Sequence, residues 1–300
     1  MSFEGSIATH WKNRRVTVMG LGRFGGGIGV TRFLVRHGAV VTLTDQANES
    51  DLTDSLNALT PHQPARLVLG RHEERDFEQT DCIVVNPAVK PNHPLLQLAR
   101  AKGIPLTSEM NLFWQLQQGR IIAVTGSNGK STTSAMIHAI LGETGIRVRL
   151  GGNIGQSLLE QVEEIQETDW TVLELSSFQL MALDHLKARP DVAVITNFSP
   201  NHLDWHGTLE NYRRAKQTLV RYQTPNDVAI LNGDDPDVSN WPTSARRLAF
   251  GIHNTDGEGV FSVSPSSSLW NVRIGETEEA IDLEKLLSVP GRHNQQNAAA

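Results

Sequence analysis

The chain has 300 residues, 39% of them hydrophobic and 20% charged, which excludes disordered and fibrous proteins and leaves room for about two domains. The formal net charge of −6 argues against nucleic acid as a partner, because the sequence has no basic stripe that could neutralise phosphates. A single cysteine excludes an internal disulfide framework. With no signal peptide and no run of roughly 18 apolar residues, the sequence predicts a cytoplasmic protein that does not enter a membrane.

Short β-branched runs alternate with helical patterns in the first third of the chain. The predicted strands are RVTVMG (15–20), AVVTLTD (39–45) and CIVVNP (82–87), the last with Cys82 buried. The helices between and after them are expected at 28–38 and 93–103. This order is typical of a parallel sheet built from βαβ units.

The same alternation begins again after the segment 111–120. We therefore predict two α/β domains, 1–116 with a Rossmann-like parallel sheet and 117–300 with a nucleotide-binding sheet. The predicted elements of the second domain are strands at 120–126, 170–177, 191–198 and 227–233, a helix at 131–145 and an antiparallel hairpin region at 256–286. The final alanines favour a helix that we expect to continue past Ala300.

The first glycine-rich loop has the pattern Gly20-x-Gly22-x-x-Gly25, directly after a strand and before a helix. Asp45 follows 20 residues after Gly25, at the end of the next strand. This context predicts a loop that binds a nucleotide diphosphate at a helix N-terminus, with the acid on a ribose hydroxyl. NAD is the default ligand of such a loop, but any other nucleotide diphosphate would meet the same backbone groups. The alternative to a binding loop is a glycine-rich turn that has only a packing role.

The second loop, TGSNGKST (125–132), has only the second half of a phosphate-loop motif. Val124 occupies the position of the first glycine, and the nearest glycine is Gly126. Backbone N–H groups of such a loop surround phosphates, Lys130 would reach the β- and γ-phosphates, and Ser131 or Thr132 would hold Mg²⁺. A strand before the loop and a helix after it favour this interpretation over a lysine-capped turn.

Three further segments carry candidate ligands. Glu174 ends an apolar strand, where an acidic side chain favours a metal role over a surface role. His202 and His206 have the spacing of a zinc pair, but no third ligand lies at a helical spacing from them. Considered from the residues alone, each is therefore better interpreted as an ordinary loop histidine. Lys216, considered alone, is a solvated helix lysine.

Together these segments resemble the Mur ligase family, the ATP-dependent amide-forming enzymes of peptidoglycan precursor synthesis. The resemblance rests on TGSNGKST, GGNIG (151–155), LELSSFQL (173–180), NHLDWHGTLENYRRAK (201–216) and GRHNQQNAAA (291–300). The segments ELSSFQL and SEMNLFW (108–114) are similar to the members that add D-glutamate to UDP-N-acetylmuramoyl-L-alanine. The family has a third domain, so the resemblance implies that these residues alone bind substrates without completing the ligation.

The resemblance also implies partners and site residues. The expected ligands are ATP with two Mg²⁺ ions, UDP-N-acetylmuramoyl-L-alanine and D-glutamate, bound to a monomer. The catalytic residues would be Lys130, Glu174, His202 and a carbamylated Lys216. The metal ligands would be Ser131, Glu174, His202 and Lys216. ATP would meet Gly126, Ser127, Asn128, Gly129, Lys130, Ser131, Thr132, Asn294 and Asn297. The UDP substrate would meet Gly22, Arg23, Phe24, Asp45, Gln46, Asn86, Asn153, Ser176 and Gln179.

Three other interpretations compete with this one. A nicotinamide-dependent oxidoreductase explains the first glycine loop but leaves Lys130, Glu174 and His202 without a role. A non-catalytic nucleotide-binding regulator leaves the same residues unexplained. Within the resemblance, a sibling Mur ligase or a folylpolyglutamate-type ligase is the nearest competitor.

Overall fold

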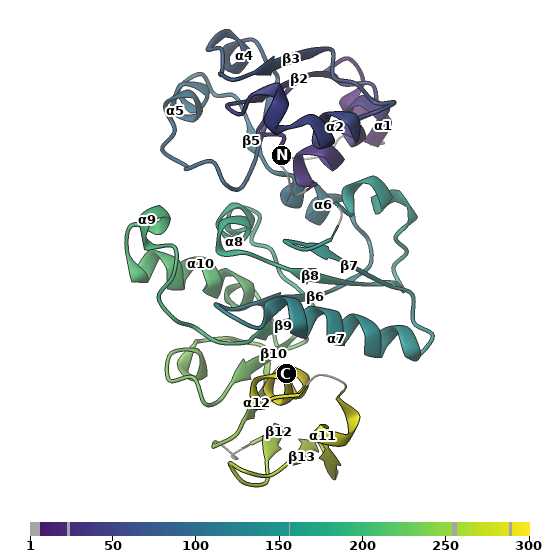
Figure 1. The fold of residues 1–300 in the computed structure, drawn as a ribbon, viewed down its shortest axis with the longest axis vertical. Helices are drawn as coiled ribbons and strands as arrows, with labels where there is room; N and C mark the ends of the chain where they lie inside the picture. The colour runs from purple at the N-terminus through teal and green to yellow at the C-terminus, as the bar shows by residue number, and fades with distance from the viewer. Residues whose placement is uncertain (1–6, 23–24, 156, 254–256, 288–289) are drawn as a thin grey trace. The chain divides into compact units, whose positions relative to one another are not determined.

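The structure is a computed structural model that describes residues 7–22, 25–155, 157–253, 257–287 and 290–300 (Figure 1). The chain divides into two compact units, Met1–Gln117 with Ile154–Ile165, and Gln118–Asn153 with Gln166–Ala300. The predicted α/β class is confirmed. One segment changes place, since Ile154–Ile165 lies in the first unit although the sequence analysis assigned it to the second domain.

The first unit contains a five-stranded sheet in which every strand pair is parallel. Its spatial order is β3-β2-β1-β4-β5. The strands are β1 Arg15–Met19, β2 Val40–Asp45, β3 Arg66–Leu69, β4 Cys82–Val85 and β5 Leu106–Thr107. Strand order reverses beside β1, and a parallel sheet opens a ligand crevice at the carboxyl ends of its strands there.

Helices flank this sheet and close its core. They are α1 Ile7–Trp11, α2 Gly26–Arg36, α3 Thr53–Asn57, α4 Arg75–Glu78, α5 Pro94–Ala101 and α6 Glu109–Leu116, with 3₁₀ turns η1 Glu49–Asp51 and η2 Leu159–Glu164. Gly25 caps α2 with φ 88°, a left-handed conformation that a glycine adopts without strain. Buried Met19, Ile83 and Leu96 join the sheet to α5. Cys82 is fully buried on β4, as predicted.

The segment Ile154–Ile165 is held in the first unit by the buried apolar side chains of Leu159, Val162 and Ile165 and by polar contacts. Arg32 of α2 contacts Glu160 at 3.1 Å, and His37, next to the end of α2, contacts Glu163 at 3.2 Å. Ser157 donates a hydrogen bond of 2.5 Å to Glu109 of α6. The segment is thus anchored to two helices of the unit.

Glu109 makes the stability of the first unit depend on pH. Burial raises the pKa of its carboxyl to about 7, and the hydrogen bond from Ser157 opposes that shift only partly. A carboxyl with a raised native pKa stabilises the fold below its unfolded pKa, and this contribution is lost as pH rises toward 7. Glu109→Gln is therefore expected to raise the free energy of unfolding at pH 8 by about 1–2 kcal/mol, and to change it little at pH 4.

Urea unfolding, monitored through amide exchange in α6, measures this effect at both pH values. Glu74→Gln is the matched control, because Glu74 is exposed in the same unit. Equal pH profiles for wild type and Glu109→Gln would contradict the expectation.

The second unit is built on a nine-stranded sheet of order β14-β13-β12-β11-β10-β9-β6-β8-β7. The strands are β6 Arg120–Thr125, β7 Val148–Gly152, β8 Trp170–Glu174, β9 Val192–Ile195, β10 Val228–Asn232, β11 Arg246–Gly251, β12 Gly259–Ser262, β13 Leu269–Ile274 and β14 Thr277–Asp282. Pairing is parallel from β7 to β12, and β13 and β14 form the predicted antiparallel hairpin. β8 is shorter than the predicted strand because Ser176 caps the next helix.

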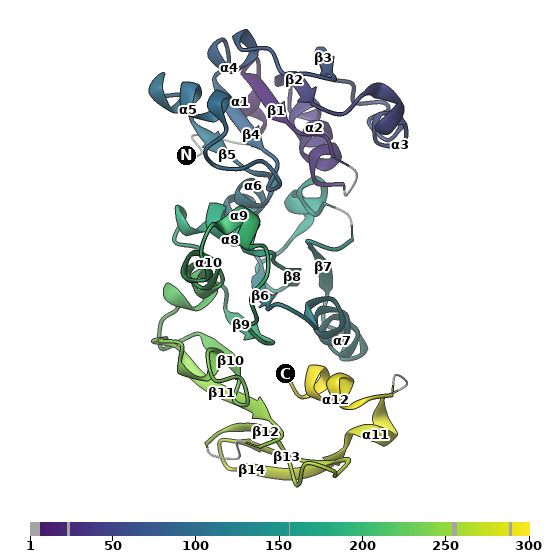
Figure 2. The same cartoon turned by 60° about the vertical axis from the view of Figure 1, so that its left-hand side comes forward.

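Helices cover the parallel part of this sheet. They are α7 Lys130–Glu143, α8 Ser177–Asp184, α9 Leu203–His206, α10 Leu209–Arg221, α11 Leu283–Leu286 and α12 Arg292–Ala299, with the 3₁₀ turn η3 Val238–Asn240. Ile137 and Leu141 of α7 pack on Ile122 and Val124, alternate residues of β6. α12 lies beside α7, and α8 beside α10 (Figure 2).

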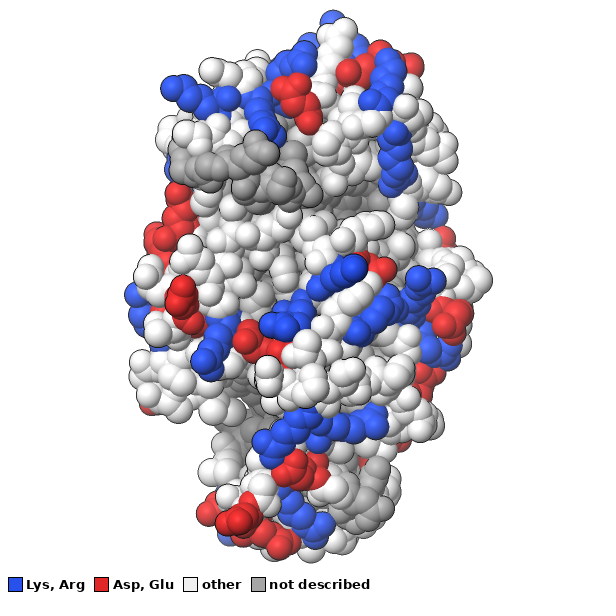
Figure 3. Space-filling model, turned by 180° about the vertical axis from the view of Figure 1, so that it is seen from behind, with Lys and Arg blue, Asp and Glu red and all other residues white. Residues whose placement is uncertain are grey.

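Charged side chains of both signs are mixed on the surface. On the face drawn in Figure 3, lysine and arginine side chains lie close to aspartate and glutamate side chains. Ion pairs of the second unit include Arg246–Glu258 at 2.7 Å and Arg213–Asp237 at 2.7 Å. In the part of the chain that the structure describes, no helix has the length and apolar character needed to span a membrane.

Candidate active site

Three neighbouring strands of the second unit end at the predicted phosphate loop. β6 lies between β8 and β9, and all three run in the same direction. The loop follows β6, Glu174 is the last residue of β8, and Thr196 and Asn197 follow β9. The topology therefore brings together segments that are far apart in the sequence, at the edge where parallel sheets bind ligands.

The loop keeps a tight path without the missing first glycine. Val124 is fully buried on β6, so the turn begins only at Gly126. A side chain at Gly126 would place its Cβ 1.9 Å from Thr196 Oγ1, which leaves room for glycine alone. Gly129 has φ 82° and caps α7, and a Cβ there would lie 2.5 Å from Asn297 Oδ1. Glycine is therefore required where the loop approaches its neighbours and not where the usual motif begins.

A buried carboxylate lies next to the first turn of α7. Glu174 is 1% exposed, accepts a 2.7 Å hydrogen bond from Ser131 Oγ, and accepts a 2.9 Å hydrogen bond from Asn153 Nδ2. A hydroxyl and a carboxylate at this separation form the oxygen donor set that Mg²⁺ prefers. Lys130 Nζ donates to Ser127 O at 3.3 Å at the edge of the same loop. The residues present therefore fit a triphosphate with its metal.

Lys216 is buried behind the loop. It is 2% exposed, and its Nζ donates to Gly126 O at 2.7 Å and lies 4.9 Å from the centre of the Tyr212 ring. The pKa of Lys216 is lowered to about 7, chiefly by burial and also by the positive charge of Lys130, whereas Glu174 opposes both effects. The interpretation of Lys216 as a solvated helix lysine, made from the residue alone, is wrong.

The two histidines of the segment 201–207 have different environments. His202 is exposed, has the unusual φ of 51°, and its ring lies 5.0 Å from that of Phe178. His206 is buried, bonds Ser177 Oγ at 2.9 Å through Nε2, and has its pKa lowered to about 4, chiefly by burial. Among the described residues, no group of three or more His, Cys, Asp or Glu side chains could hold a metal by itself. A zinc pair therefore finds no third protein ligand in that part of the chain.

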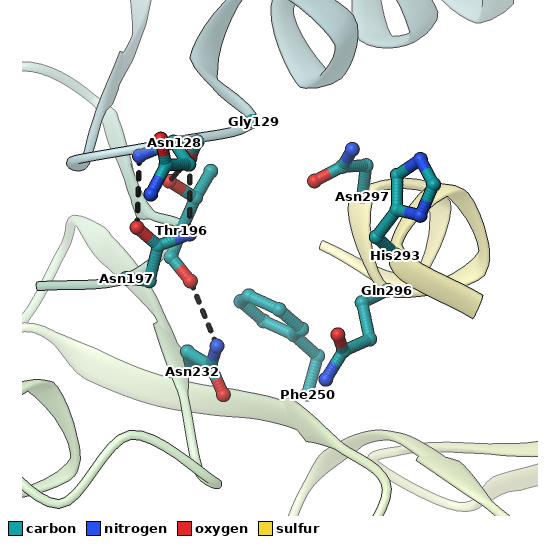
Figure 4. Close-up of a pocket in the computed structure, with 9 residues that line it drawn as sticks. All are labelled: Asn128, Gly129, Thr196, Asn197, Asn232, Phe250, His293, Gln296 and Asn297. Carbon is teal, nitrogen blue, oxygen red and sulfur yellow. Dashed lines mark hydrogen bonds between the residues drawn. The ribbon is translucent and has the colours of Figure 1, made fainter. Parts of the chain in front are cut away.

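A cavity of about 270 Å³ opens beside the phosphate loop (Figure 4). Its lining comes from the loop, from the ends of β9, β10 and β11, and from α12, namely Asn128, Gly129, Thr196, Asn197, Asn232, Phe250, His293, Gln296 and Asn297. Figure 4 shows Asn297 and His293 across the cavity from Asn128 and Gly129. Asn294, also expected to meet ATP, instead donates to Pro290 O at 2.9 Å and is not part of the lining.

The first unit has a larger cavity, of about 620 Å³, at the carboxyl ends of β1, β2 and β4. Four of the residues predicted to bind the UDP substrate line it: Gly22, Asp45, Gln46 and Asn86. His72, Lys90 and His93 also line this cavity, although no sequence pattern pointed to them. Burial lowers the pKa of His72, the nearby His93 lowers it further, and Asp45 opposes the shift.

Asp45 is bonded to the glycine loop itself. Its Oδ2 accepts hydrogen bonds from the backbone N–H groups of Leu21 at 2.8 Å and Gly22 at 3.2 Å, and its Oδ1 accepts one from Ala47. The carboxylate therefore fixes the loop, a role that the fingerprint alone did not predict. Arg23 and Phe24, predicted to contact the UDP substrate, lie outside the described residues.

Three other predicted substrate residues make hydrogen bonds within the second unit. Ser176 and Gln179 form the capping box of α8, in which Ser176 Oγ accepts from Gln179 N–H and Gln179 Oε1 accepts from Ser176 N–H. Asn153 is tied to Glu174 by its side chain and by its backbone N–H, which donates to Glu174 O at 2.7 Å. Contacts of these three residues with a substrate stay a prediction.

Comparison with known proteins decides the family. The Mur ligase middle domain matches residues 124–300, and the MurD-like N-terminal domain of Mur ligases matches residues 14–108. The chain belongs to the Mur ligase family. Its interpretation as a nicotinamide-dependent oxidoreductase is thereby set aside.

Relatives of this Mur ligase share one name. A UDP-N-acetylmuramoylalanine–D-glutamate ligase from Roseiflexus sp. is 46% identical over 223 residues, which are 74% of this chain and 48% of the relative. A protein of the same name from Ruminiclostridium cellulolyticum is 40% identical over 291 residues, 96% of this chain and 61% of the relative. The chain thus spans less than two thirds of the length of these relatives.

Solved Mur ligase structures share the fold. The UDP-N-acetylmuramate:L-alanyl-gamma-D-glutamyl-meso-diaminopimelate ligase from Neisseria meningitides superposes with a TM-score of 0.63, covering 96% of this chain and 91% of the other. MurC from Thermotoga maritima superposes with a TM-score of 0.54, covering 96% and 63%. The sequence identities are 16% and 21%, so this likeness concerns the fold alone.

Proposed function

We propose that this chain provides the UDP-substrate-binding and ATP-binding parts of a ligase that joins D-glutamate to UDP-N-acetylmuramoyl-L-alanine. The observation that supports it most is the grouping of Lys130, Ser131 and Glu174 around one loop, with Lys216 buried behind it. The names of the relatives at 46% and 40% identity supply the substrates. The domains 1–116 and 117–300 would hold the UDP substrate and ATP respectively.

The reaction would proceed through an acyl phosphate. The terminal carboxylate of the UDP substrate attacks the γ-phosphorus of ATP, so that a C–O–P link forms and ADP leaves. The amine of D-glutamate then attacks the acyl carbon, loses a proton, and the tetrahedral intermediate expels phosphate to leave the amide. The reaction needs no further co-reactant.

The residues of the chain would mainly position the substrates and neutralise their negative charge. Lys130 would offset charge on the transferring phosphoryl group, and the loop amides would hold the phosphates. Ser131, Glu174, His202 and a carbamylated Lys216 would hold two Mg²⁺ ions, which screen the negative charge of the phosphates when bound. A carbamate at Lys216 would offer oxygen ligands where an ammonium would repel the metal.

Binding to the 300-residue chain tests the proposal. Titration calorimetry with UDP-N-acetylmuramoyl-L-alanine, with a non-hydrolysable ATP analogue and Mg²⁺, and with NADH is expected to give heat for the first two ligands only. Saturable binding of NADH without binding of the UDP substrate would refute the proposal. The expectation that these residues alone do not complete the ligation stays a prediction, and D-glutamate incorporation by them would contradict it.

A further inference from the structure

Asn197 contacts both backbone groups of one residue of the phosphate loop. Its Oδ1 accepts a hydrogen bond from Asn128 N–H at 2.8 Å, and its Nδ2 donates to Asn128 O at 3.0 Å. Its own backbone carbonyl accepts from Ser127 N–H at 3.0 Å. We propose that Asn197 is a positioning residue for ATP, which sets the direction of the loop amides without itself taking part in the chemistry. This inference rests on the proposed function.

The carbonyl of Asn128 is held by two donors. Besides Asn197 Nδ2, Thr196 Oγ1 donates to it at 2.6 Å, and Figure 4 shows both side chains below the loop. A trans peptide group is planar, so its N–H points away from its C=O. Fixing Asn128 O on the side of β9 therefore turns the N–H of Gly129 to the opposite side.

The direction of that N–H matters because it belongs to the start of α7. Gly129 is the N-cap, and the first backbone hydrogen bond of the helix runs from Thr133 N–H to Gly129 O at 2.9 Å. The N–H groups of Gly129 and of the first turn consequently have no partner within the helix. Such groups hold phosphate oxygens when a rigid loop aims them at one point. Asn197 supplies that rigidity from the neighbouring strand.

The side chain at position 197 needs one acceptor and one donor in the same plane. Asparagine offers both, whereas aspartate offers only acceptors and would place a negative charge against the carbonyl of Asn128. Asn197 is only partly buried, so water can take over its hydrogen bonds when it is removed. A substitution is therefore expected to loosen the loop while the fold of the unit remains.

Nucleotide binding and amide exchange in the 300-residue chain test the inference. Asn197→Ala is expected to weaken binding of AMP-PNP with Mg²⁺ about tenfold, because the loop amides must then be ordered by the nucleotide itself, and Asn197→Asp more strongly because of its charge. Hydrogen exchange of the Asn128 amide should accelerate in both variants. Affinity for UDP-N-acetylmuramoyl-L-alanine and the melting temperature should stay at the wild-type values.

Asn240→Ala is the matched control. Asn240 is an exposed asparagine of the same unit whose Nδ2 also donates to a backbone carbonyl, that of Pro236 at 2.8 Å. Its variant is expected to bind AMP-PNP as wild type does. Wild-type AMP-PNP affinity in folded Asn197→Ala and Asn197→Asp would overturn the inference and leave the proposed function standing. A wild-type chain that does not bind AMP-PNP would overturn both.

Discussion

Lys130→Ala is expected to lower the rate of acyl-phosphate formation by roughly 10²–10³-fold in the complete enzyme, meaning these residues within a polypeptide of the relatives' full length. The reason is electrostatic. Lys130 begins α7 at the loop, where its ammonium would face phosphoryl oxygens that gain negative charge during transfer. Trapping the acyl phosphate with hydroxylamine in the absence of D-glutamate measures this step alone.

Two further variants make that result specific. Lys130→Arg keeps the charge but changes its shape, and is expected to retain an intermediate rate. Lys285→Ala removes an exposed lysine of the same unit and is expected to leave the rate unchanged. Undiminished acyl-phosphate formation in Lys130→Ala would refute the role of this residue.

The fold could be predicted because it is encoded locally. The runs RVTVMG and RIIAVTG have the β-branched composition of buried parallel strands, and each is followed by glycines and a helical pattern. The predicted strands 15–20, 39–45 and 82–87 agree with β1, β2 and β4 to within two residues at each end. The placement of Ile154–Ile165 in the first unit had no such signal, because its buried Leu159, Val162 and Ile165 indicate a helical turn but not which of the two cores that turn packs against.

The grouping of Lys130 and Glu174 could be anticipated for a topological reason. Lys130 lies after β6 and Glu174 ends β8, and neighbouring parallel strands have their carboxyl ends at the same edge of the sheet. Thr196 and Asn197 directly follow β9, so the same rule could have identified them. Their hydrogen bonds to the loop join residues 68 and 69 positions apart, a pairing that no local pattern reveals.

The burial of Lys216 had a signal in its own segment that was not used. Segment 209–221 is polar on average, but Tyr212, Ala215, Leu219 and Val220 recur at helical spacing and place Lys216 on the buried face of α10. Packing of α10 beside β6 brings Nζ to the carbonyl of Gly126, 90 positions away. Only the family resemblance pointed to a special role, and the structure supplies a physical reason to consider it.

Lys216 is expected to form a carbamate near neutral pH, where an ordinary lysine remains protonated and unreactive. Only the neutral amine attacks CO₂, and burial holds the pKa of Lys216 at about 7. At fixed dissolved CO₂, the neutral fraction rises about tenfold between pH 6 and pH 8, whereas a lysine at its usual pKa stays almost fully charged. The ¹³C resonance of a carbamate in ¹³CO₂-equilibrated chain should therefore grow over this interval.

The corresponding loss of function is expected to be large. Lys216→Ala should lower ligation in the complete enzyme by roughly 10³-fold, because the site loses both the metal ligand and the group that fills this buried position. Acetate or propionate in the buffer should restore part of the activity, since a free carboxylate can occupy the place of the carbamate. Lys216→Arg cannot form a carbamate and should show neither the resonance nor the rescue, because its side chain still fills the space. Full activity of Lys216→Ala without added carboxylate would exclude a carbamate from the mechanism, whatever the resonance shows.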